Sequence, residues 1–133
     1  MDKNYDFLVQ KARDLIRSRY EKEGHHSVVA AALLTEDGNI YTALNAGTYQ
    51  PSIATCAEII AIGTAHTAQQ EMKIKAIVAV RDPDAYVITP CGKCREHIAD
   101  YSDDALVAIP VGQDDYEMVP VSTLLPHKYV KRV

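Results

Sequence analysis

The feature that most limits the fold of this 133-residue chain is the alternation of short apolar runs with helical segments. Unbroken apolar runs of strand length cover Val28–Leu34 and Ala105–Ile109, and Ile74–Val80 is interrupted only by Lys75. Such runs are typical of strands that are buried on both faces. Strands that alternate with helices favour a mixed sheet whose parallel members are joined by right-handed crossovers. The sequence therefore predicts an α/β fold of three layers, with a mixed sheet of about five strands between helices.

Three segments have the composition of helices. The first runs from Tyr5 to about Glu23, and Gly24 is expected to end it. A second, from Thr55 to about Gln70, is apolar nearly all round and is therefore expected to be central. The third covers Cys91–Tyr101, with Pro90 at the helix start. The apolar residues of the first segment recur at helical spacing on one face: Leu8, Ala12, Leu15 and Ile16.

Turn-forming residues divide the remaining segments. The run Val28–Leu34 and the segment Ile40–Leu44 are separated by Glu36-Asp37-Gly38-Asn39, which predicts a hairpin. Pro110 is expected to end the run at Ala105–Ile109. The other expected elements are a loop at Asn45–Ala54, a polar turn at Arg81–Tyr86, a short strand at Tyr116–Val119 and a helical turn at Ser122–Leu125.

Composition narrows the class of partner. The 14 lysines and arginines are scattered, and 18 aspartates and glutamates give a net charge of −4. A polynucleotide or a membrane surface is not the expected partner, because either would favour a basic stripe. No apolar run approaches the roughly 18 residues of a membrane span, and the N-terminus does not resemble a signal peptide. We therefore expect a cytoplasmic protein, with residues 1–133 forming one domain.

Cysteine is the residue type whose placement indicates chemistry. All three cysteines, Cys56, Cys91 and Cys94, fall at the predicted starts of two helices. Helix N-termini favour anions, so these thiols are expected to have lowered pKa values and to act as thiolates. Three thiolates can hold one Zn²⁺ per chain and leave its fourth position to water. Glu58, two residues after Cys56, is expected to carry protons beside that position.

Each fragment also has a simpler interpretation. Thr55 and Glu58 have the spacing of a capping box, in which the carboxylate only satisfies a backbone donor. The spacing of Cys91 and Cys94 also suits a redox-active dithiol, and buried cysteines are often only small hydrophobic residues. His97, three residues after Cys94, would close a site of three cysteines and one histidine and make the metal structural. The other histidines have no ligand spacing and are expected at the surface: His25, His26, His66 and His127.

Cys56-Ala57-Glu58, followed by Pro90-Cys91-Gly92-Lys93-Cys94, resembles the zinc signature of the cytidine deaminase superfamily. Residues 30–42 are similar to the first two strands of that family, and Asn45 matches an asparagine that binds the sugar. The resemblance implies that the Ala57 N–H and the carbonyl near Thr89 hold the base. It also implies a homotetramer of small subunits, with one zinc ion in each and active sites completed by neighbouring chains.

The chain departs from the plain cytidine deaminase pattern at several positions. Gly47 replaces a glutamate that usually contacts the sugar, and Ile59 replaces an arginine that commonly offsets the thiolate charge. Lys93 is expected to supply that charge instead. Ser27 or Val28 stands near the place of a phenylalanine that packs by the base, and Tyr49 is expected to restore stacking area. These changes resemble the blasticidin S deaminase branch, as do Cys91-Gly92-Lys93-Cys94-Arg95 and residues 124–130.

The expected function is hydrolytic deamination of a small cytosine-type nucleoside, such as cytidine, deoxycytidine or a close analogue, with release of ammonia. Gly47 favours an alternative, a cytosine nucleoside antibiotic with a modified sugar such as blasticidin S. A second alternative is a non-catalytic interaction module with a structural zinc, completed by His97. The acidic balance disfavours a deaminase that edits nucleic acids.

Overall fold

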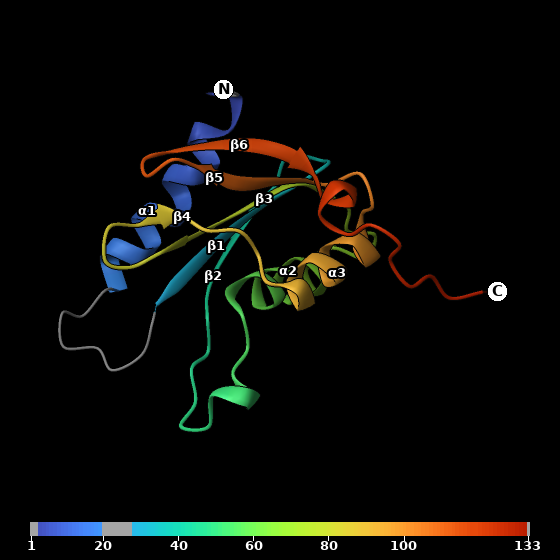
Figure 1. Ribbon diagram of the computed structural model, residues 1–133, viewed down its shortest axis with the longest axis horizontal. Coiled ribbons are helices and arrows are strands. Elements are labelled where there is room, and N and C mark those ends of the chain that lie inside the picture. Colours follow the sequence, from blue (N-terminus) through green and yellow to red (C-terminus); the bar gives the residue numbers. More distant parts are fainter. Residues whose placement is uncertain (1–2, 20–27, 133) are drawn as a thin grey trace.

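A mixed six-stranded sheet forms the middle of the molecule in the computed structural model, which describes residues 3–19 and 28–132 (Figure 1). The strands are β1 (Val29–Thr35), β2 (Ile40–Leu44), β3 (Ile74–Arg81), β4 (Tyr86–Val87), β5 (Leu106–Val111) and β6 (Asp115–Pro120). The helices are α1 (Asp6–Arg19), α2 (Ala57–Ala68) and α3 (Gly92–Tyr101), with short 3₁₀ helices η1 (Lys3–Tyr5), η2 (Pro51–Ile53) and η3 (Val121–Leu124). None of the helices in these ranges is long and apolar enough to cross a bilayer.

The strands follow the order β2-β1-β3-β5-β6, with β4 paired to the end of β3. Strand β1 is antiparallel to both β2 and β3, and β6 is antiparallel to β5. Strands β3 and β5 are parallel, because α3 carries the chain back across the sheet between them. The starts of α2 and α3 are thereby brought to the same side of the sheet (Figure 1).

The central strand β1 shows why the molecule has three layers. Alternate side chains of a strand point to opposite faces, and residues 30–35 are all buried. Ala30 and Ala32 belong to a core cluster with Leu8 and Ile16 of α1. Ala31 and Leu33 belong to a second cluster, which contains buried residues of α2 and α3. The predicted α/β/α fold is therefore confirmed, with α1 on one face and α2 and α3 on the other (Figure 1).

Several predicted details are wrong or fall outside the description. Strand β5 continues through Pro110, which pairs with Tyr116 of β6 beyond the short stretch that pairs with β3. Proline is tolerated there because the strand has become an edge on its β3 side. Helix α2 is an outer layer and not a central helix, because only one of its sides packs on the sheet and Gly63 is exposed. Strand β4 occupies the end of the predicted turn. The predicted end of the first helix, Gly24, lies outside the described residues, as do His25, His26 and Ser27.

Candidate metal centre

Two helix starts bring the three thiols together. Cys56 is the N-cap of α2 and Cys91 is the N-cap of α3, each with extended backbone angles that stop the helix from beginning earlier. The predicted helix start at Pro90 is therefore wrong, because α3 begins at Gly92. Cys94 follows in the first turn of α3, with its side chain fully buried. The site thus combines the half-buried thiol of Cys56, which precedes β3 in the sequence, with the exposed thiol of Cys91 and the buried thiol of Cys94, which follow it.

The spacing of the sulfurs suits a single metal ion. The three Sγ atoms lie within 4.8 Å of one another, and those of Cys56 and Cys91 are 3.9 Å apart. Tetrahedral zinc with Zn–S bonds of about 2.3 Å would hold its sulfurs about 3.8 Å apart. The sulfur positions therefore fit zinc without rearrangement of the backbone. Convergence of all three thiols also favours a metal site over a redox pair of Cys91 and Cys94 alone.

The pKa values of the thiols differ from the expectation that all three are lowered. Burial raises the pKa of Cys94 far above its usual range, and burial also raises the pKa of Cys56. Burial acts in the same direction on Cys91, but hydrogen bonds from the Cys94 backbone and from the neighbouring thiols lower its pKa overall. The prediction is thus wrong for Cys56 and Cys94 in the metal-free chain. A cation that binds here displaces protons from these thiols, so its affinity is coupled to their burial.

Glu58 lies in the first turn of α2, two residues after Cys56. Its side chain is only 4% exposed, and burial raises the pKa of its carboxyl group. The capping-box interpretation does not hold, because the N-cap is Cys56 and its side chain makes no capping bond. Thr55 is instead paired through its backbone with Ala46. Glu58 is therefore not explained by helix capping, and a desolvated carboxyl group beside a metal site is a frequent feature of acid–base chemistry.

A cavity of about 290 Å³ opens beside the sulfurs. Glu58 is the only acidic side chain among the described residues that line it. Asn45 also lines the cavity, and its Oδ1 accepts a hydrogen bond of 2.9 Å from the Val29 N–H. The remaining lining residues come from β1, the loop before α2, the first residue of α2 and the segment before α3: Val29, Pro51, Ala54, Thr55, Cys56, Ala57, Ile88, Thr89 and Cys91. Of these, the sequence singles out no role for Pro51, Ala54 or Ile88, because wall residues carry no chemical signature.

His97 does not join the sulfurs. Its ring stacks on Tyr101 with centroids 5.7 Å apart, and its Nδ1 is buried with no partner among the described residues. The metal-ligating group found in residues 3–19 and 28–132 contains the three cysteines and no histidine. His66 and His127 are exposed, as expected. The geometry therefore favours three protein ligands over a closed site of three cysteines and one histidine.

Three positions singled out in the sequence lie away from the cavity. Lys93 is exposed at the start of α3. Tyr49 is fully exposed, and it lines a separate surface depression together with Gly47. Arg95, for which the sequence predicts no role, is instead half-buried beside the cysteine segment. Its guanidinium donates to the backbone carbonyls of Pro90 and Leu124, at 2.9 and 3.5 Å.

A protein-family model matches most of the chain, including the three cysteines and Glu58. This family model, described as the cytidine and deoxycytidylate deaminase zinc-binding region, matches residues 2–109. The chain belongs to this deaminase family. The predicted resemblance is thus confirmed, and with it the zinc cofactor, since the family's metal-binding region coincides with three sulfurs able to hold an ion. This member of the deaminase family is accordingly a hydrolytic enzyme.

Two curated relatives support the assignment over almost the whole deaminase chain. A blasticidin-S deaminase from Bacillus cereus is 37% identical over 131 residues, covering 93% of this chain and 91% of its own. A cytidine deaminase from Sporosarcina psychrophila is 34% identical over 123 residues, covering 92% of this chain and 86% of its own. Both branches named by the sequence resemblance are therefore represented among its relatives.

Solved structures of the deaminase fold agree with the architecture. The cytidine deaminase from Bacillus anthracis superposes with a TM-score of 0.79 at 26% identity, covering 93% of this chain and 88% of that one. The cytidine deaminase from Mycobacterium leprae gives the same TM-score of 0.79 at 23% identity, covering 95% and 100%. The second likeness shows the shared fold alone.

Proposed function

We propose that this chain is a zinc-dependent hydrolytic deaminase of small cytosine-type nucleosides. The observation that carries the proposal is a buried carboxyl group, that of Glu58, in one cavity with a zinc-compatible set of sulfurs. Such a site suits replacement of an amino group by oxygen, a reaction in which protons must be moved at a water-activating metal. The single domain proposed for residues 1–133 then contains all the groups that react.

The proposed chemistry assigns the proton transfers to Glu58. Zinc, when bound to Cys56, Cys91 and Cys94, lowers the pKa of a coordinated water toward neutrality. Water adds to C4 of the cytosine ring, and Glu58 accepts its proton and passes it to N3. Glu58 then transfers the second water proton from the oxygen on C4 to the exocyclic nitrogen. The bond between C4 and this nitrogen breaks, ammonia departs, and C4 becomes the carbonyl of the uracil ring. The raised pKa of the buried carboxyl group favours both accepting and returning a proton.

The cavity walls suggest how the substrate is held. Asn45 is fixed by its bond to Val29 and presents its side chain to the cavity, where we assign it to the sugar. Ala57 and Thr89 both line the cavity, and we assign the Ala57 N–H and the carbonyl near Thr89 to the edge of the base. Tyr49 enters the proposal as a stacking residue on an exposed loop. Lys93 is given no part in it, because its exposed side chain lies outside the cavity lining.

A second candidate substrate is a cytosine nucleoside with a modified sugar, as in blasticidin S. The specific observation is that Glu58 is the one carboxylate among the described lining residues, whereas Gly47 lies outside the cavity. The described lining of the cavity therefore lacks a second carboxylate that could bind the hydroxyl groups of a normal ribose. The identity of 37% to a blasticidin-S deaminase supports the same direction.

We further propose that the enzyme works as a cytoplasmic homotetramer with one zinc ion in each subunit. Exposed apolar side chains on the loop before α2 support association, since Tyr49 and Ile53 contact little of their own chain. Three cysteines without disulfide bonds suit a reducing compartment. Light scattering coupled to size-exclusion chromatography checks the assembly: four times the 14.7 kDa chain mass supports it, and a monomer contradicts it.

The decisive experiment is an ammonia-release screen with the zinc-loaded protein. The substrates are cytidine, deoxycytidine, blasticidin S and free cytosine, with adenosine as a control for other aminated rings. Release from cytidine, deoxycytidine or blasticidin S supports the proposal, and the ratio of their kcat/KM values separates the two candidate substrates. Release from none of these nucleosides by fully zinc-loaded protein would overturn it.

A further inference from the structure

Cys91 is the ligand whose side chain is supported least by its surroundings. It is exposed, whereas Cys94 is fully buried in the protein core. The position of the Cys91 sulfur therefore depends on the backbone that carries it. That backbone is extended, with φ −66° and ψ 167°, and lies at the junction between the segment after β4 and helix α3.

The side chain of Arg95 holds the peptide unit before Cys91, and the helical backbone at position 95 holds the unit after it. The Nε of Arg95 donates a hydrogen bond of 2.9 Å to the carbonyl oxygen of Pro90, which belongs to the peptide unit before Cys91. The backbone N–H of Arg95 donates a bond of 2.9 Å to the carbonyl oxygen of Cys91, in the peptide unit after it. Because both peptide planes are fixed, the two dihedral angles of Cys91 are fixed with them.

The bond to Pro90 is one that the helix itself cannot make. The first hydrogen bond of α3 is accepted by Cys91, so the carbonyl of Pro90 lies outside the helical ladder. Pro90 is buried, and a buried carbonyl without a donor is unfavourable. A guanidinium donor satisfies this oxygen with a charge-assisted bond, which is stronger than a neutral one.

The other end of the guanidinium is anchored to a fixed part of the fold. Arg95 reaches the carbonyl of Leu124 at 3.5 Å, at the last residue of η3. Helix η3 begins at Val121, which is fully buried and whose N–H donates to Ala105 at 2.8 Å. A cation is favourable at this position because the last carbonyls of a helical turn lack intrahelical donors.

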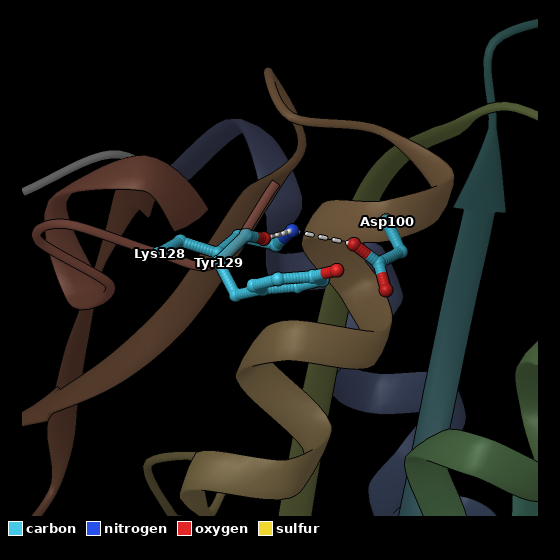
Figure 2. Close-up of polar contacts among 3 residues, drawn as sticks. All are labelled: Asp100, Lys128 and Tyr129. Carbon is cyan, nitrogen blue, oxygen red and sulfur yellow. Dashed lines mark hydrogen bonds and ion pairs between the residues drawn. The ribbon is translucent and has the colours of Figure 1, made fainter. Parts of the chain in front are cut away.

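The segment that follows η3 is fastened to α3 a second time. Figure 2 shows Lys128 between Asp100 of α3 and the carbonyl of Tyr129, and the Nζ of Lys128 lies 2.6 Å from the Asp100 carboxylate. The same Nζ donates to the Tyr129 carbonyl at 2.9 Å. Helix α3 is thus tied to the C-terminal segment near its start by Arg95 and near its end by Asp100.

From these contacts we infer that Arg95 is a positioning residue, which sets the metal affinity of the centre by holding Cys91 in ligand geometry. Lys93 carries the same charge on the same turn of α3, but its side chain points in a different direction from that of Arg95. The two residues are about 200° apart around the helix, so Lys93 faces solvent while Arg95 faces Pro90 and η3. The inference rests on Cys91 being a zinc ligand and does not depend on which nucleoside is the substrate.

The test compares Arg95→Met with its matched control Lys93→Met, both in the full chain. Each variant loses one positive charge from the first turns of α3 and keeps an unbranched side chain. We expect zinc affinity, measured by competition with a chromophoric chelator, to fall about 10- to 100-fold in Arg95→Met. Lys93→Met is expected to change it less than about threefold, as an exposed charge should.

Cobalt substitution supplies a readout that a merely structural role would not move. The thiolate-to-cobalt absorption bands should shift or weaken in Arg95→Met and remain unchanged in Lys93→Met. A variant that melts at lower temperature without metal, yet binds zinc and cobalt as the unmodified chain does, would overturn the inference. Deamination is not measured, so failure of the proposed function and failure of this inference are distinguishable.

A third variant keeps the test decisive if Arg95→Met does not fold. Arg95→Lys retains the charge but replaces the planar guanidinium by one ammonium, which cannot serve Pro90 and Leu124 in the same geometry. Zinc affinity lowered by more than about threefold supports the positioning role. Unchanged affinity and unchanged cobalt bands contradict it.

Discussion

The starts of α2 and α3 have the same local backbone and opposite surroundings. Cys56 and Cys91 are both N-caps with φ near −70° and extended ψ, and the carbonyl of each accepts the first bond of its helix. The start of α2 also carries the buried carboxyl group of Glu58, whereas the start of α3 carries two thiols and an external tie through Arg95. In the proposed mechanism, the start of α2 provides the carboxyl group that carries protons, and the start of α3 provides two of the three metal ligands.

This comparison shows that burial and local hydrogen bonds, and not position at a helix start alone, set the pKa of each group. Both helix starts should favour anions, yet burial raises the pKa values of Cys56 and Cys94, whereas hydrogen bonds lower that of Cys91 against the effect of its burial. The largest experimental effects should therefore follow the buried groups. Substitutions at exposed residues of the same helices serve as controls.

The largest effect is expected for Glu58→Gln, which removes the proposed proton carrier and keeps the side-chain shape. Turnover should fall by about 10²- to 10⁴-fold, the range attributed to general acid–base catalysis. Zinc content should remain at one ion per chain, because Glu58 is not one of the three clustered ligands. Ammonia release and metal analysis on the same sample measure both. Glu96→Gln, an exposed glutamate of α3, is the matched control, and equal turnover in the two variants would remove Glu58 from the mechanism.

The next effect separates the two cysteines of α3. Cys91→Ala and Cys94→Ala should each lose stoichiometric zinc, since two thiolates are too few for a tight site. In the metal-free state Cys94→Ala should in addition lose about 1 kcal/mol of unfolding free energy, because a fully buried side chain is shortened. Cys91→Ala should lose almost none, because that thiol is exposed. Urea unfolding in the presence of a chelator measures this difference, and a reversed order would contradict the assigned burial.

A smaller effect is expected at the wall of the cavity. Asn45→Ala should raise KM for a nucleoside about tenfold and should also cost about 1 kcal/mol of stability, because the Val29 N–H loses its acceptor. Steady-state kinetics and thermal unfolding measure the two effects. Gln50→Ala, at an exposed position in the same loop, is the control. An unchanged KM in Asn45→Ala would remove this residue from substrate binding.

The smallest effect on the folded chain is expected for Tyr49→Ala. The side chain is fully exposed, so zinc content should be unchanged and stability should change by less than about 0.5 kcal/mol. Metal analysis and thermal unfolding check this expectation. A rise in KM without loss of stability then reports a substrate contact of Tyr49. A large drop in stability with an unchanged assembly mass would contradict its exposure.

Much of the fold follows from the sequence because its signals are local. The apolar runs predict β1, β3 and the start of β5, and the cysteines with Glu58 predict the residues that converge at the metal centre. The errors arise where tertiary context decides. Pro110 remains in β5 only because its β3 neighbour has ended. Helix α2 is an outer helix although its sequence is apolar nearly all round, because its polar residues Thr64, His66 and Thr67 face outward. The thiol pKa values depend on burial, which periodicity does not reveal.

Arg95 illustrates a role that pattern analysis cannot supply. Its partners are the backbone carbonyls of Pro90 and Leu124. Every residue has such a carbonyl, so the residue types at these positions do not indicate the contact. Lys93 is the nearer candidate by sequence, because it lies between the two cysteines. Only the rotation of successive residues around a helix separates the two cations.

Cys56 and Cys91 are 35 positions apart in the sequence, and the segment between them contains β3. A growing or refolding chain therefore has no complete ligand set until α3 has docked back on the sheet. Metal binding should therefore be a late folding event, because it requires that the right-handed crossover from β3 through α3 to β5 has already formed. The time at which thiolate-to-cobalt absorption appears after dilution from denaturant would date that event directly.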